Sequence, residues 1–550
     1  MQKTGKLELT WVGKYEEIAV EPRILIEDPS KSYGDPNSEN MLIHGDNLIA
    51  LKALEHDYAG RIQCVYLDPP YNIDAANEHY DDYVENSVWL SLMRKRLDII
   101  KNLMAPDGVI LVQIDKEQSA YLKVLMDEVF TRDAYITTIA VRMSATSGYK
   151  IEHSSKTIVK NTEYIHVYSR DLKIHRPAYE MVEYDSHYSC ILEPVEDGLF
   201  LIKNLLDQQF VIDEIKKYSL KKNADSLKTL FKISEGFRSY VYENKELIGR
   251  THTAPAGAKK EAEFLNSMLV SNNLAIRRNY GEDVYYIKKT DTGFNQYIPI
   301  SLKYNMVDSI DGYTEQHSNI LGDWWDGFYL DMGNVDNEGD VYFKNSKKPE
   351  RLIFRIINMF TNEGDYILDS FLGSGTTAAV AHKMNRRWIG IEMGDHAYSL
   401  CRPRLNNVID AKDSNGVTTM CKWQGGGGYK FYELAPSLLV PNPKIPSIMQ
   451  INPEYTFEQM CEAICKIEGF KYKPQGRMHG HSSEKRFIHI TKEFVNAEYI
   501  NSLLATLDEG QSVLIYGTKI QSGLRLPDNV EVKKIPKDLL DKCKFESEVR

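Results

Sequence analysis

Apolar residues follow two different spacings between Met41 and about Arg170, and the two spacings alternate. Short, nearly continuous apolar runs predict buried strands, whereas apolar residues that recur every three or four positions predict amphipathic helices. The runs cover residues 41–44, 62–67, 109–114 and 164–168, and the helical spacing covers 47–54, 88–104 and 120–130. Strands that alternate with helices are typical of a parallel, doubly wound sheet, so an α/β fold is predicted.

The alternation stops near Asp171 and returns at Pro349. In between, helical stretches such as 199–218 mix with polar loops and aromatic strands such as 284–287, which predicts a separate or inserted domain. The later segment resumes with a helix, a strand over 366–368, a further helix and a strand over 388–391, so one sheet is expected from two distant pieces. The predicted parts are an N-terminal segment (1–40), the first part of the core (41–170), the inserted domain (171–325), the second part of the core (326–415), and a small α+β module (416–550) with a glycine-rich loop or hinge at 425–428.

Charge and composition narrow the class of protein. The chain has 67 basic and 78 acidic residues and a net charge of -11, which argues against an indiscriminate nucleic-acid coat but leaves room for local basic patches. Candidate patches are Arg277-Arg278, Lys288-Lys289, 344–351 and 477–486, each weighed evenly against a solvated face. No membrane span or signal peptide is apparent, and the seven scattered cysteines suggest no disulfide framework, so a cytoplasmic protein is expected.

A glycine turn follows the strand expected at 366–368. Its residues, Gly373 to Ala378, fit the dinucleotide pattern G-x-G-x-x-A, and Glu392 follows at the spacing of a ribose-binding acid. This pattern alone suits a nicotinamide or flavin enzyme as well as a methyltransferase. Asp369 at the strand end can bind an ammonium group, and Phe371 can pack against a sulfonium. The two side chains together favour S-adenosylmethionine.

The strand expected at 62–67 ends in Asp68-Pro69-Pro70-Tyr71. An exocyclic amine on a base is a poor nucleophile because its lone pair is delocalised into the ring. Acceptors from Asp68 and the Pro69 carbonyl would localise that lone pair, and the two prolines keep the loop rigid. Tyr71 offers a stacking face worth roughly 1–3 kcal/mol to an unstacked base. The tetrapeptide therefore indicates amine chemistry on a flipped base.

In this order the two motifs resemble the beta-class amino-methyltransferases of DNA, most closely the modification subunits of type III restriction–modification systems. The target-base motif of that family precedes the cofactor motif, and the DNA-reading domain lies between them. The similarity extends to further segments of this chain, namely His44 to Leu48, Trp89-Leu90, Arg96-Leu97, Asp107 to Ile110, Lys348-Pro349 and Leu352-Ile353.

The resemblance implies a circularly permuted, Rossmann-like methyltransferase sheet. It implies that Asp46 contacts the cofactor's adenine, that Lys348 and Pro349 lie near its methionine end, and that Glu392 binds the ribose. With Asp369, Phe371, Gly373, Gly375 and Thr376 these residues form the expected cofactor site, and Asp68, Pro69, Pro70 and Tyr71 form the catalytic site. The aspartate of the target motif favours adenine N6. Expected partners are double-stranded DNA, read by residues 171–325 with phosphate contacts from Arg277, Arg278, Lys288 and Lys289, a second copy of the chain, and a restriction helicase–nuclease subunit.

Three alternatives remain open at this stage. The same machinery could act on cytosine N4 or on RNA, the chain could be a catalytically idle DNA-recognition subunit, or it could be a dinucleotide oxidoreductase. No metal is expected, because Cys461 and Cys465 suit an apolar helix face and His479 and His481 suit a solvated loop. For the aromatic cluster Trp324, Trp325, Phe328 and Tyr329, core packing is favoured over a DNA-facing edge.

Overall fold

The computed structural model describes residues 8–16, 23–72, 85–145, 158–196, 198–253, 273–280, 283–290, 293–341 and 347–540. The chain divides into two compact units, Pro177–Leu321 and the remainder. Of the helices in the described ranges, none is both long and apolar enough to cross a lipid bilayer.

The larger unit is built on one 11-stranded sheet, whose main strand order is β1-β20-β3-β19-β18-β4-β5-β7-β6-β17, with β2 paired to β20. Strands β3, β19, β18, β4 and β5 are parallel, as expected. Strand β7 runs antiparallel between β5 and β6, and β1 runs antiparallel to β20, so antiparallel strands flank the predicted parallel part of the sheet. The bounds are β1 Leu25–Glu27, β2 Tyr33–Gly34, β3 Met41–His44, β4 Ile62–Leu67, β5 Met104–Ile114, β6 Tyr135–Arg142, β7 Thr162–Ser169, β17 Trp324–Trp325, β18 Tyr366–Asp369, β19 Arg387–Glu392 and β20 Gly428–Leu434.

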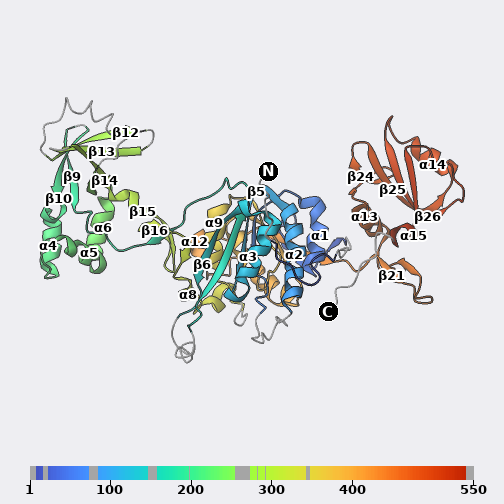
Figure 1. Cartoon of the computed structure of the whole chain (residues 1–550), viewed down its shortest axis with the longest axis horizontal. Helices are drawn as coiled ribbons and strands as arrows, with labels where there is room; N and C mark the ends of the chain where they lie inside the picture. The colour runs from blue at the N-terminus through green and yellow to red at the C-terminus, as the bar shows by residue number, and fades with distance from the viewer. Residues whose placement is uncertain are drawn as a thin grey trace. The chain divides into compact units, whose positions relative to one another are not determined.

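Helices cover both faces of this sheet (Figure 1). Helices α1 (Asn47–Tyr58), α2 (Asn86–Leu103) and α3 (Lys116–Phe130) pack together over one apolar face. Helices α9 (Glu350–Phe360), α10 (Thr376–Lys383) and α11 (Arg402–Ile409) form a second group, in which α10 packs against α9, α11, β18 and β19. Strands covered on both faces lose contact with solvent, which is why every residue of β4 and β18 is buried and nearly all of them are apolar.

The two sequence-distant pieces of the core interleave. Strand β18 lies between β19 and β4, and β19 lies between β18 and β3. The strand that carries the glycine turn therefore pairs directly with the strand that carries the diproline motif, and the predicted permuted, doubly wound arrangement is confirmed. The sheet also extends beyond residue 415, where we expected the core to end, because β20 pairs in parallel with β3.

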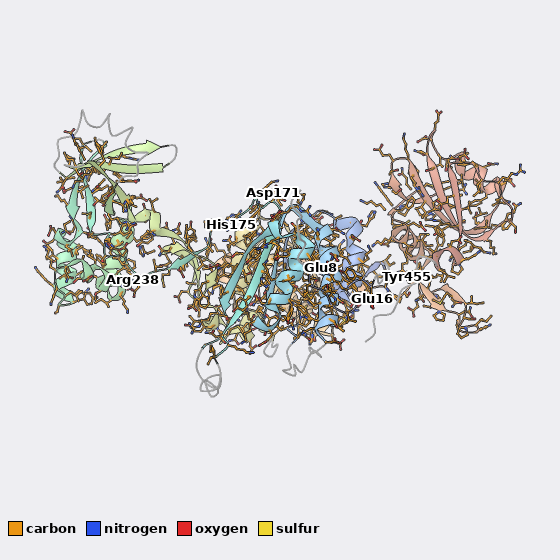
Figure 2. The ribbon with its side chains drawn as sticks, in the orientation of Figure 1. Glu8, Glu16, Asp171, His175, Arg238 and Tyr455 are labelled. Carbon is orange, nitrogen blue, oxygen red and sulfur yellow. The ribbon has the colours of Figure 1, made fainter. Side chains whose placement is uncertain are left out.

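Unit Pro177–Leu321 contains a closed barrel of strand order β10-β12-β13-β14-β11-β9. The helix expected over 199–218 is wrong in its first part, because Leu199–Asn204 forms strand β10 and helix α4 begins only at Gln209. Arg238, labelled in Figure 2, donates hydrogen bonds to the last carbonyls of α5. The other bounds are β8 Tyr179–Met181, β9 Cys190–Glu196, α4 Gln209–Lys217, α5 Ala224–Ile233, α6 Glu235–Glu243, β11 Ile248–Thr253, β12 Leu274–Tyr280, β13 Asp283–Thr290, β14 Gly293–Pro299, β15 Tyr304–Ser309 and β16 Gly312–Ile320.

The C-terminal module is a five-stranded sheet, β23-β24-β25-β26-β27, with α13 and α14. Cys461 and Cys465 are buried on α13 within its apolar core. His479 and His481 lie on strand β24, so the solvated loop expected for them was wrong. The remaining bounds are α8 Phe328–Asp331, α12 Thr418–Cys421, β21 Leu439–Pro441, β22 Met449–Ile451, α13 Phe457–Ile467, β23 Lys471–Gln475, β24 Met478–Ser483, β25 Arg486–Val495, α14 Ala497–Leu504, β26 Ser512–Ile520, β27 Val530–Lys534 and α15 Lys537–Leu540.

Candidate functional site

A row of carboxylates lines the carboxyl edge of the core sheet. Asp46, Glu392, Asp369 and Asp68 lie at or just beyond the ends of β3, β19, β18 and β4, which are parallel neighbours in that order. Ligands of open α/β sheets bind outside the carboxyl ends of the strands. The sheet therefore brings the predicted cofactor acids and the predicted catalytic acid to a single edge.

The glycine turn connects β18 to α10 in a left-handed conformation, with φ of 55° at Gly373 and 81° at Gly375. Asp369 holds the turn, because its Oδ1 accepts a hydrogen bond from the Phe371 amide at 2.9 Å and its Oδ2 accepts one from Thr377 Oγ1 at 2.6 Å. Burial raises the pKa of Asp369 to about 7. A cation bound beside it would favour the charged form.

Glu392 reaches back from the end of β19 to the same turn. Its Oε2 accepts a hydrogen bond from the Gly373 amide at 2.7 Å, and its Oε1 accepts one from the Gly394 amide at 2.9 Å. An ionised carboxylate has about four acceptor positions and can accept hydrogen bonds from hydroxyl groups as well as from backbone amides. The geometry is compatible with the ribose contact expected of Glu392.

Asp46 accepts a hydrogen bond from the Ile49 amide at 3.1 Å and thereby caps α1. The neighbouring Asn47 donates to the Ser370 carbonyl at 2.7 Å, which ties the start of α1 to the loop after β18. The Ser370 hydroxyl is buried and has no hydrogen-bond partner among the described residues. An unpartnered polar atom at this edge fits a site that takes a polar ligand.

The side chain of Thr376 is directed into the protein interior, toward Arg404. Its Oγ1 accepts a hydrogen bond from Arg404 Nη1 at 2.7 Å, and its side chain is buried. Arg404 belongs to a fully buried ionic cluster with Glu350, Lys383 and Asp413. Burial acts to raise the pKa of Glu350, but Lys383 and Arg404 outweigh it and lower the pKa to about 2. In this geometry Thr376 connects the glycine turn to the buried ionic cluster.

Hydrogen bonds hold Pro70 and Tyr71 of the diproline motif. Tyr71 Oη lies 2.8 Å from Asp68 Oδ1 and 2.8 Å from Glu163 Oε2. The indole of Trp89 donates to the Pro70 carbonyl at 2.8 Å. Burial raises the pKa of Asp68, and Lys348 offsets only part of this effect.

Lys348 lies beside the target motif, and the place near the cofactor's methionine end that the resemblance implies for it stays a prediction. Its Nζ is 2.9 Å from Asp68 Oδ2 and 3.5 Å from Glu163 Oε2, and it lies 4.9 Å from the centre of the Tyr71 ring. Pro349 follows as the N-cap of α9. Sequence reasoning missed Glu163, which comes from the antiparallel strand β7. Its only signal was an acidic residue at the start of an otherwise apolar run.

The predicted DNA-binding residues lie on neighbouring strands of the barrel. Arg277 on β12 is exposed and pairs with Tyr286 on β13. Because faces alternate along a strand, Lys288 shares the face of Arg277, and Lys289 points to the opposite one. The side chain of Arg278 lies outside the described residues. The described cations are therefore split between the two faces of the ribbon.

The aromatic cluster near residue 325 is mainly core. Trp325 and Phe328 are buried, and Arg355 lies over both rings. Trp324 is 48% exposed at the edge of the sheet. Core packing, the favoured expectation, is confirmed for Trp325 and Phe328.

A family model described as DNA methylase matches residues 62–402, which include both strand-end motifs. The chain belongs to this DNA methylase family. The family resemblance seen in the motifs is thus confirmed. The DNA methylase region spans the site from β4 to the start of α11 and encloses unit Pro177–Leu321.

Several relatives of this DNA methylase are modification subunits. The probable type III restriction-modification enzyme HindVI Mod subunit of Haemophilus influenzae is 34% identical over 78% of this chain and 58% of that protein. The StyLTI Mod subunit of Salmonella typhimurium is 25% identical over 74% of this chain and 60% of its own length. The EcoP15I Mod subunit of Escherichia coli is 22% identical over 96% and 89%. The chain spans about three fifths of the length of the first two relatives.

Proposed function

We propose that this chain transfers a methyl group from S-adenosylmethionine to the N6 amine of a flipped adenine in double-stranded DNA. The observation that carries the proposal is the direct pairing of β18 with β4. This pairing brings the glycine turn and Asp68 to adjacent positions at one edge of the sheet. Methyl donor and acceptor amine must meet within bonding reach, and adjacent strand ends supply such a place.

The residues at the edge suit the cofactor. Asp369 offers a buried carboxylate to an ammonium group, Glu392 offers acceptor positions to ribose hydroxyls, and Asp46 offers a carboxylate at the end of β3. Phe371 follows Asp369 at the turn, and Gly373 and Gly375 keep the backbone free of side chains there. When bound, S-adenosylmethionine supplies an electrophilic methyl group on a sulfonium.

The target motif suits an exocyclic amine. Asp68, when ionised, accepts a hydrogen bond from the amine, and the Pro69 carbonyl offers a second acceptor, so the nitrogen lone pair is directed away from the ring. Tyr71 gives the extracted base a stacking face, which offsets part of the few kcal/mol that flipping costs. The aspartate favours adenine N6 over cytosine N4, and membership of the DNA methylase family favours DNA over RNA and methyl transfer over hydride transfer.

We further propose that Pro177–Leu321 reads the DNA sequence. The exposed Arg277 and the neighbouring Lys288 would meet phosphates from one side of the β12–β13 ribbon. We also propose that the chain acts as a dimer in the cytoplasm. Because several relatives are named as Mod subunits of type III restriction-modification enzymes, a restriction subunit is a further proposed partner. The C-terminal module is the candidate for these contacts.

The test is methylation by the full chain in a host that lacks its own adenine methylation. Mass spectrometry of nucleosides should detect N6-methyladenine, and long-read sequencing should place it in one short motif. Asp68→Ala should abolish the signal and retain calorimetric binding of S-adenosylmethionine. Asp98→Ala, which removes a half-exposed carboxylate on α2, should behave as wild type. An active Asp68→Ala chain, or N4-methylcytosine in place of N6-methyladenine, would contradict the proposal.

A further inference from the structure

One ammonium group in the target site is shared by two carboxylates. Lys348 Nζ lies 2.9 Å from Asp68 Oδ2 and 3.5 Å from Glu163 Oε2, and the Lys348 side chain is 12% exposed. The Tyr71 hydroxyl joins the same two carboxylates at 2.8 Å each. Asp68, Glu163, Tyr71 and Lys348 thus form a closed ring of polar contacts.

Glu163 is anchored from the core. Its Oε2 accepts a hydrogen bond from Gln113 Nε2 at 2.5 Å, and Gln113 Oε1 in turn accepts one from Tyr66 Oη at 2.7 Å. Gln113 is fully buried on β5, and Tyr66 is buried on β4. The carboxylate of Glu163 is therefore fixed in place next to the target motif and is not free to follow a moving partner.

Lys348 also occupies the position of a substrate. Its Nζ is a nitrogen donor to Asp68 and lies over the Tyr71 ring, as the amine of a flipped base would. A base that stacks on Tyr71 and bonds Asp68 must displace this ammonium. Glu163 is the carboxylate within reach that can receive it.

We propose that Lys348 and Glu163 are positioning residues that control Asp68: Lys348 holds the Asp68 carboxylate ionised until the target amine arrives, and Glu163 then takes over the Lys348 ammonium. The inference rests on the proposed function. It concerns residues outside the tetrapeptide and gives Lys348 a role at the amine rather than at the cofactor.

The charges around Asp68 support this assignment. The groups that face it are Lys348 from the segment before α9, Glu163 from β7, Tyr71 from its own loop, Tyr66 from β4 and Asp369 from β18. Lys348 is the cation among them. Burial raises the pKa of Asp68, Glu163 raises it further, and Lys348 lowers it. A protonated Asp68 would have lost acceptor capacity, so its charge decides whether the amine can be bound.

The two residues should shift the pH dependence in opposite directions. Lys348→Met removes the cation, so the pKa of Asp68 rises and the acid limb of the methylation rate moves to higher pH. Glu163→Gln removes a negative charge, so the pKa of Asp68 falls and the limb moves to lower pH. A merely structural role would lower the rate equally at every pH.

The experiment measures single-turnover methyl transfer against pH for the full chain, with genomic DNA from a methylation-free host and radiolabelled S-adenosylmethionine. Lys348→Met should lower the rate at pH values below the acid limb roughly tenfold or more beyond any loss that it causes above the limb. Lys348→Arg keeps the charge and should restore the wild-type limb. Calorimetry with S-adenosylmethionine checks that each variant is folded and binds its cofactor.

Two results would overturn the inference in an active enzyme: limbs that coincide with wild type in both variants, or limbs that move in the same direction. If Lys348→Met does not fold, Glu163→Gln still tests the inference, because this variant alone should move the acid limb to lower pH. A wild-type chain that transfers no methyl group to DNA would instead overturn the proposed function together with this inference.

Discussion

Glu350→Gln should destabilise the core, although glutamine has nearly the same size and shape as glutamate. Glu350 is fully buried and accepts hydrogen bonds from Lys383 Nζ at 2.7 Å, from Arg404 Nη2 at 2.7 Å and from the Val417 amide at 3.0 Å. The amide side chain keeps the size but not the charge, and it turns a donor toward one of the two cations. Removal of one partner from a buried ion pair costs about 3–5 kcal/mol.

The pKa of Glu350 leads to a similar magnitude. The lowering from 4.5 to about 2 corresponds to roughly 3 kcal/mol of stability at neutral pH. Because the pKa is lower in the folded state, this contribution is fully present above pH 4.5. It is lost as the pH falls through about 2, and the variant should lack this part of the acid dependence.

Hydrogen-exchange mass spectrometry of peptides from β18 and α10 measures the effect locally, which suits a chain of several parts. A loss of about 3 kcal/mol should speed exchange of the most protected amides more than a hundredfold. Glu39→Gln is the matched control, because the Glu39–Arg387 pair at 2.9 Å is about half exposed and should contribute about 1 kcal/mol or less. Equal exchange in both variants would refute the reasoning.

Three further predictions concern the site and the DNA. Gly375→Val should abolish calorimetric binding of S-adenosylmethionine, because a branched side chain would occupy the space where the backbone must approach the ligand. Gly364→Val controls for backbone strain, because it has the same φ of 81° and open space around it, and it should bind normally. Normal binding by both variants would make the turn a packing feature only. Tyr71→Ala should weaken base flipping by roughly 1–3 kcal/mol, read from 2-aminopurine fluorescence, and Tyr71→Phe should keep it; equal loss in both would exclude stacking. Arg277→Gln should weaken binding to all DNA sequences and reduce the slope of log affinity against log salt concentration by about 1. Replacement of Pro177–Leu321 by the corresponding unit of a relative should change the methylated motif. If the slope and the motif both stay unchanged, recognition lies elsewhere in the chain.

The main parts of the site were predictable from sequence because they follow directly from strands. Asp68 and Asp369 end apolar runs that could only be buried, and parallel neighbours place such ends at one edge. Gly375 was predictable because a left-handed turn needs glycine.

The supporting contacts were not predictable, because they depend on which strand lies beside which. Glu163 reaches Tyr71 only because β7 runs antiparallel between β5 and β6, and an apolar run does not state its direction. The contact of Lys348 with Asp68 was not foreseen, since it depends on how the chain before α9 approaches β4. Thr376 was expected to contact the cofactor. Its hydrogen bond from Arg404 depends on how α11 packs, which the sequence does not show.

The interleaved strand order has a consequence for protein synthesis. Strands β3 and β4 appear early in the chain but never touch, since β18 and β19 fill the space between them. Until that pair emerges from the ribosome, both early strands have open edges that invite wrong partners. The growing chain therefore cannot close its core sheet until β18 and β19, and after them β20, have been synthesised.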